Sequence, residues 1–116
     1  MPQDEPAVGQ KTAIGYVGGR HFTAYVEEVK ALKRAGRLSE CESLLLKILD
    51  ANEAQARIPG MALAPWWYEQ LAIIYRKQKN YAAEVAVLGR HADQPGSFGL
   101  ALRLHKAKTL LSRHQG

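Results

Sequence analysis

The sequence has one cysteine, no apolar run long enough to cross a bilayer and no segment with the layout expected of a signal peptide. A lone Cys41 cannot form an intramolecular disulfide, so nothing in the chain requires an oxidising compartment. A transmembrane helix needs about 20 mostly apolar residues. The first ten residues, MPQDEPAVGQ, lack the charged and then apolar layout of a secretory leader. We therefore expect a soluble, cytoplasmic protein with no membrane partner.

Motifs that carry catalysis or hold metal ions are also missing. The four histidines show none of the four-residue spacings of a helical zinc site. The segment GYVGGR lacks the spacing and the lysine of a phosphate-binding loop. Cys41 lies between Glu40 and Glu42, whose charges favour the protonated thiol, so we expect it to be inert packing. The chain is therefore predicted to be no enzyme and to use no cofactor and no metal.

Acidic residues are absent from the C-terminal end of the chain. Lys and Arg number 16 against 11 Asp and Glu, a formal net charge of +5. The residues from Pro95 onward include Arg103, Lys106, Lys108 and Arg113 but no carboxylate. Such a cationic surface favours acidic proteins or nucleic acid as partners, although it also serves solubility alone.

The N-terminal residues differ in composition from the rest of the chain. Residues 1–20 contain two prolines, four glycines and scattered apolar residues, which predicts a flexible arm. Within it, residues 13–17 form either a short extended segment or the end of a preceding domain. Residues 21–116 are expected to form one helical domain, since a chain of this length buries a single core.

Apolar residues at helical spacing predict a helix hairpin over about residues 21–58. Its first helix ends at Gly36, a typical left-handed stop. Ser39, with Glu42 three residues later, is predicted to form a capping box that starts the second helix. A loop over about residues 59–64 follows. The apolar positions of this hairpin are Phe22, Tyr25, Val29, Leu32, Cys41, Leu44, Leu45, Ile48 and Leu49.

The same pattern predicts a second hairpin over about residues 65–94 and a terminal helix over about 98–113. Pro65 suits a helix start, and Asn80 suits the N-cap of the hairpin's second helix. The apolar stripe of the terminal helix comprises Leu100, Leu104, Ala107 and Leu111.

The two hairpins superpose with an offset of 43 residues, as from Val29 to Ala72. The segment WWYEQLAIIYRKQKNY resembles the tetratricopeptide repeat. Leu71, Ala72 and Tyr75 match the Leu-Gly-x-x-Tyr positions of that repeat, and Tyr81 matches the aromatic of its second helix. The resemblance implies an all-α fold in which two antiparallel helix hairpins stack as a short solenoid, covered by the terminal helix as a cap.

The chain departs from this family at several positions. Glu84 stands where the family has a small alanine, and Glu28 stands where it has leucine. The offset of 43 also exceeds the family's repeat of about 34 residues. Either the second helix therefore overruns, or the segment ARIPGMALA loops out.

The resemblance also implies a groove along the inner face of the first helix of each repeat, where the family binds extended peptides. The residues carried over to this groove are Thr23, Val26, Lys30, Lys33, Arg34, Trp66, Glu69, Ile73, Arg76 and Lys77, of which Thr23 and Val26 are not assigned to partner binding. Because five of these ten are cations, we expect an acidic protein or peptide as the partner. The alternative is that these side chains form ordinary solvated helix faces.

Two further interpretations stay open. The basic helices are also compatible with sequence-nonspecific binding of nucleic acid through its phosphates. Because stable solenoids usually have at least three repeats, the chain is alternatively a homodimer or part of a longer protein.

Overall fold

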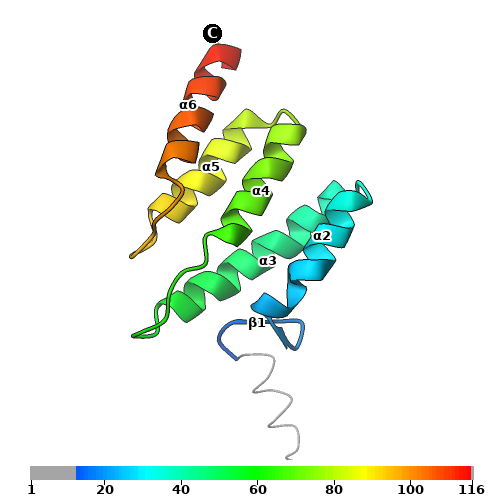
Figure 1. The fold of residues 1–116 in the computed structure, drawn as a ribbon, viewed down its shortest axis with the longest axis vertical. Helices are drawn as coiled ribbons and strands as arrows, with labels where there is room; N and C mark the ends of the chain where they lie inside the picture. The colour runs from blue at the N-terminus through cyan, green and yellow to red at the C-terminus, as the bar shows by residue number, and fades with distance from the viewer. Residues whose placement is uncertain (1–12, 116) are drawn as a thin grey trace, which may run out of the picture. The chain divides into compact units, whose positions relative to one another are not determined.

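The structure, a computed structural model, describes residues 13–115, whose regular secondary structure is helical apart from one two-stranded hairpin (Figure 1). This confirms the predicted all-α class. Contacts divide the chain into two compact units, residues 1–62 and 63–116, which we call the first and second units. Among residues 13–115, no helix is both long and apolar enough to cross a membrane.

The first unit is an antiparallel helix hairpin preceded by a short β-hairpin (Figure 1). Its elements are β1 (Tyr16–Val17), β2 (Arg20–His21), the 3-10 helix η1 (Phe22–Tyr25), α2 (Val26–Arg34) and α3 (Leu38–Ala56). Both β1 and η1 contact α3, as α2 does. Its largest fully buried side chains are Phe22, Val29, Cys41, Leu45, Ile48, Leu49 and Asn52. Leu44, expected in this core, is half-buried.

The β-hairpin corrects the expectation of a flexible arm over residues 1–20. Residues 1–12 lie outside the described residues, but Tyr16 pairs with His21, and Val17 pairs with Arg20. The turn between them is Gly18 and Gly19, both at positive φ, which suits a two-residue hairpin. The hydroxyl of Tyr25 donates to the carbonyl of Val17 over 2.6 Å. These contacts fix the segment on the helices of the first unit.

The link between α2 and α3 was predicted correctly at Gly36 and wrongly at the next helix start. Gly36 has φ 73° and donates to the carbonyl of Lys33 over 3.1 Å. The N-cap of α3 is Arg37, whose side chain makes no capping hydrogen bond, so Ser39 lies inside the first turn. Arg37 instead reaches Glu40 over 2.6 Å. This ion pair across the first turn takes the place of the predicted capping box.

The second unit is a three-helix arrangement in which α5 (Tyr81–Ala92) contacts both α4 (Trp66–Lys77) and α6 (Ala101–Gln115) (Figure 1). Asn80 caps α5 as predicted, because its side chain accepts from the amide of Ala83 over 3.2 Å. The most deeply buried apolar residues of this unit are Tyr68, Leu71, Ala72, Ile74, Leu88 and Ala107.

The 43-residue offset recurs in the buried positions of the two hairpins. Val29 and Ala72 are both fully buried, and so are Leu45 and Leu88. The extra length comes from the second helix of the first hairpin, since α3 has 19 residues and α5 has 12. Of the two expected explanations for the long offset, the structure therefore favours helix overrun.

Candidate functional site

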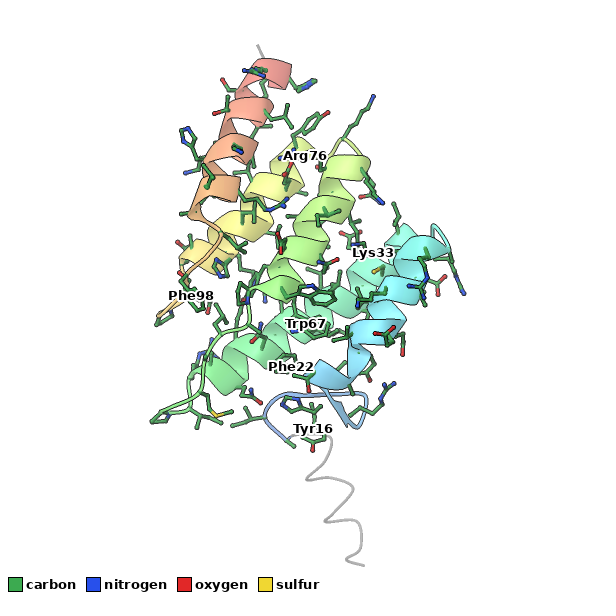
Figure 2. The ribbon with its side chains drawn as sticks, in the orientation of Figure 1. Tyr16, Phe22, Lys33, Trp67, Arg76 and Phe98 are labelled. Atoms are coloured by element: carbon green, nitrogen blue, oxygen red, sulfur yellow. The ribbon has the colours of Figure 1, made fainter. Side chains whose placement is uncertain are left out.

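The three predicted site residues on α2 face different surroundings. Lys30 lies 3.7 Å from Glu27 on the same helix, and Arg34 is exposed. Lys33 is half-buried near the end of α2, where its charge acts on Cys41 of α3 (Figure 2). Burial raises the pKa of the Cys41 thiol, and Lys33 partly opposes this shift. Because the thiol stays protonated and fully buried, Cys41 acts as packing in the first unit.

The aromatic pair at the start of α4 divides as expected, with one ring inside and one nearer the surface. Trp67 is buried and Trp66 is half-buried. Their rings meet edge to face with centroids 4.7 Å apart, a favourable aromatic geometry. Trp66 therefore packs against Trp67 and remains partly exposed.

Of the predicted site residues further along α4, Glu69 and Arg76 lie beside α6. Glu69 pairs with Arg103 of α6 over 3.2 Å, and each side chain is about one-third exposed. Ile73 is half-buried and Lys77 is exposed. The inner face of α4, which the sequence predicted as open groove floor, is thus partly bordered by the terminal helix.

Arg76 of α4 forms an ion pair with Glu84 of α5 through three hydrogen bonds. Its Nε donates to both carboxylate oxygens of Glu84 at 3.0 Å, and its Nη2 donates to Oε2 at 2.7 Å. Glu84 is fully buried, whereas the side chain of Arg76 is 43% exposed near the end of α4 (Figure 2). The hydrogen bond with Glu84 raises the pKa of Arg76. Glu84, at the position where the resemblance leads us to expect a small alanine, is therefore one half of an ion pair.

Two adjoining hollows of about 400 and 370 Å³ lie between α4 and α6 in the second unit. Arg76 and Lys106 line both of them. We call the two hollows together the α4–α6 trough. The other side chains and backbone that line it belong to Glu69, Gly99, Leu100, Leu102, Arg103, His105, Thr109, Leu110 and Arg113.

The trough brings together residues that the sequence prediction had left outside the site. Lys106 and Arg113 had been recognised only as part of a cationic tail. Their seven-residue separation on a predicted helix was the available signal, because it places both on one helix face. Glu84 was missed because nothing in its sequence position shows that Arg76 reaches it.

His91 of α5 is a buried polar residue that does not line the α4–α6 trough. Its side chain is 2% exposed, and its Nε2 has no hydrogen-bond partner within residues 13–115. Its ring meets the ring of Tyr68 edge to face, with centroids 5.0 Å apart. Burial lowers the pKa of His91. The described residues contain no group of three His, Cys, Asp or Glu side chains that could hold a metal ion.

Comparison with known proteins does not assign the chain to a family. No protein-family model matches it, and neither a curated protein nor a solved structure does. The resemblance to tetratricopeptide repeats therefore stays a hypothesis based on the residues quoted above.

Proposed function

We propose that this protein is an interaction module that binds an acidic segment of another protein. The observation that carries the proposal is a repeated pair of cations at the end of α2 and of α4. Lys33 and Arg34 end α2, and Arg76 and Lys77 end α4 at the 43-residue offset. Arg34 and Lys77 are exposed, and neither has a carboxylate within 4 Å among the residues that the structure describes.

The chemistry of these positions supports a carboxylate-bearing ligand. Guanidinium and ammonium groups form charge-assisted hydrogen bonds with carboxylates, and these are stronger than neutral ones. Trp66 offers a partly exposed ring of the type often found at the centre of protein interfaces.

The proposal is tested by titrating the full chain with a glutamate-rich peptide and a lysine-rich peptide of equal length. We expect only the acidic peptide to bind. The double variant Arg34→Glu with Lys77→Glu should weaken binding about tenfold, since each reversal removes one surface attraction of up to about 1 kcal/mol and adds repulsion. Lys47→Glu with Arg57→Glu is the control, because these cations are exposed but lie outside the site. No binding of the acidic peptide at low salt would refute the proposal.

A second candidate function is nonspecific binding of nucleic acid. It is favoured by α6, which exposes Lys106, Lys108 and Arg113. Binding through phosphates weakens steeply with salt and does not depend on base sequence. A steep salt dependence with mixed DNA or RNA, combined with no response to the acidic peptide, would replace the first proposal with this one.

A further inference from the structure

The terminal helix α6 presents two different faces within the second unit. One face packs on α5 and includes Ala107, which is fully buried. A neighbouring face lines the α4–α6 trough with Lys106, Leu110 and Arg113, at steps of four and three residues. These steps keep the three side chains on one stripe along the helix. The helix thus serves both as a cover for α5 and as a wall of the trough.

The charges along the trough are not balanced. Arg76 is opposed by the buried carboxylate of Glu84, and Arg103 is opposed by Glu69. In contrast, Lys106 has no carboxylate within 4 Å in the described part of the chain, and the same holds for Arg113. The trough therefore has two uncompensated cations at fixed positions on one helix.

The distance between Lys106 and Arg113 sets the separation that two carboxylates of a ligand need in order to reach both cations. Seven helical residues rise about 10.5 Å, so the backbone positions of Lys106 and Arg113 are about that far apart. A polyproline II chain rises about 3.1 Å per residue and repeats every three residues, so side chains three apart share a face about 9 Å apart. Two carboxylates three residues apart on such an extended chain therefore match the separation of Lys106 and Arg113 to within about 2 Å.

From this geometry, and on the basis of the proposed function, we propose a specific ligand for the α4–α6 trough. It is an extended acidic segment of a partner protein with two carboxylate side chains three residues apart. Lys106 binds one carboxylate and Arg113 binds the other. The half-buried Leu110 lies between them in sequence and contacts an apolar residue between the two acids.

The probe is a capped peptide, Gly-Ser-Glu-Val-Pro-Glu-Ser-Gly, titrated into the isotope-labelled full chain and followed by NMR chemical shifts. The matched peptide, Gly-Ser-Val-Glu-Glu-Pro-Ser-Gly, has the same composition with adjacent glutamates. We expect the spaced peptide to bind at least about threefold more tightly and to shift the amide signals of α6. Lys106→Glu and Arg113→Glu should each weaken its binding about three- to tenfold, as expected for loss and reversal of an exposed charge pair.

Lys108→Glu is the control variant, because Lys108 is exposed on the same helix but does not line the trough. Circular dichroism melting checks that each variant folds. Equal binding of the two peptides, or an equal effect of Lys108→Glu and Lys106→Glu, would overturn this inference. If acidic peptides still bind and Arg34→Glu with Lys77→Glu weakens them, the proposed function survives that result. If duplex DNA binds and neither peptide does, both proposals are wrong.

Discussion

Lys79 occupies in the second hairpin the backbone conformation that Gly36 occupies in the first. Gly36 has φ 73° and Lys79 has φ 58°, which makes Lys79 the one non-glycine residue at positive φ within residues 13–115. Each donates to the carbonyl three residues earlier, at 3.1 Å from Gly36 and 3.0 Å from Lys79. In each hairpin, the next residue donates to the carbonyl five residues earlier. Both first helices therefore end in the same Schellman motif, 43 residues apart.

Replacing Lys79 by glycine should stabilise the second unit. The left-handed conformation costs a residue with a Cβ atom roughly 1 kcal/mol, and glycine avoids this cost. We expect Lys79→Gly to raise the free energy of unfolding by about 0.5–1 kcal/mol. Both tryptophans of the chain lie in α4, so urea unfolding followed by tryptophan fluorescence reports on this unit. A loss of stability would mean that Lys79 makes contacts that outweigh its backbone strain.

The reciprocal change in the first unit tests the same relationship from the other side. A Cβ added at Gly36 meets nothing within 4 Å, so the substitution introduces backbone strain without a clash. Gly36→Lys should therefore destabilise the first unit by about 1 kcal/mol. Hydrogen exchange of the α2 and α3 amides measures this change, and unchanged exchange would show that the turn tolerates a side chain.

Helix positions and turns were predictable because they depend on neighbours in the sequence. Gly36 and Asn80 act through hydrogen bonds to residues at most five positions away. A short extended segment was one of the two alternatives for residues 13–17, and β1 lies there. The β-hairpin itself was not predicted, although its Gly-Gly turn was a usable signal. Its two-residue strands depend on contacts with distant residues, such as the hydrogen bond between His21 and Gln55 of α3. Such short strands are not stable on their own.

The candidate site was predictable only in part, for a similar reason. Helical spacing and the resemblance identified Arg76 as a cation on the inner face of α4. They did not show that Glu84, eight residues away and across the turn, holds this guanidinium. The contribution of α6 to the trough also depends on how three helices pack, which local patterns do not encode. Residues joined by tertiary packing were therefore the ones missed.

The docking of the β-hairpin on the first unit should be sensitive to Gly15. A Cβ at Gly15 would lie 2.7 Å from Gln55 Oε1 and 2.9 Å from His21 Nε2, so it would separate the hydrogen-bonded pair. Gly15→Ala should therefore expose the segment to proteolysis and lower the stability of the first unit by about 1–3 kcal/mol. Gly19→Ala is the matched control, since Gly19 also has positive φ but a Cβ there meets nothing within 4 Å. Equal effects would show that backbone strain alone is responsible.

The ion pair between Arg76 and Glu84 should respond unequally to removal of either partner. Arg76→Ala leaves a fully buried carboxylate without its cation, and we expect a loss of about 1–3 kcal/mol. The loss stays below that of a fully buried pair, because Arg76 is 43% exposed and water can enter in its place. Glu84→Gln keeps a hydrogen-bond acceptor and leaves Arg76 close to solvent, so it should cost less. Urea unfolding of both variants and of the double variant measures the loss of unfolding free energy in each. Equal losses in the two single variants would contradict the view that the unpaired buried charge of Glu84 causes the destabilisation.

Acid should destabilise the second unit through His91. Burial lowers the pKa of His91 in the folded chain, whereas in the unfolded chain His91 has the usual histidine pKa of about 6.5. As the pH falls toward 6.5 and below, the unfolded chain therefore binds more protons than the folded chain. The free energy of unfolding should therefore fall as the pH drops below about 7, and this fall should level off below the folded-state pKa. The buried residue at the equivalent position of the first hairpin, 43 residues earlier, is Ile48. The variant His91→Ile should therefore lose this pH dependence of the free energy of unfolding. His105→Gln is the control, because His105 is exposed. Unfolding by urea from pH 7.5 to pH 5 provides the measurement, and the same slope in His91→Ile and the unmodified protein would exclude His91 as the cause.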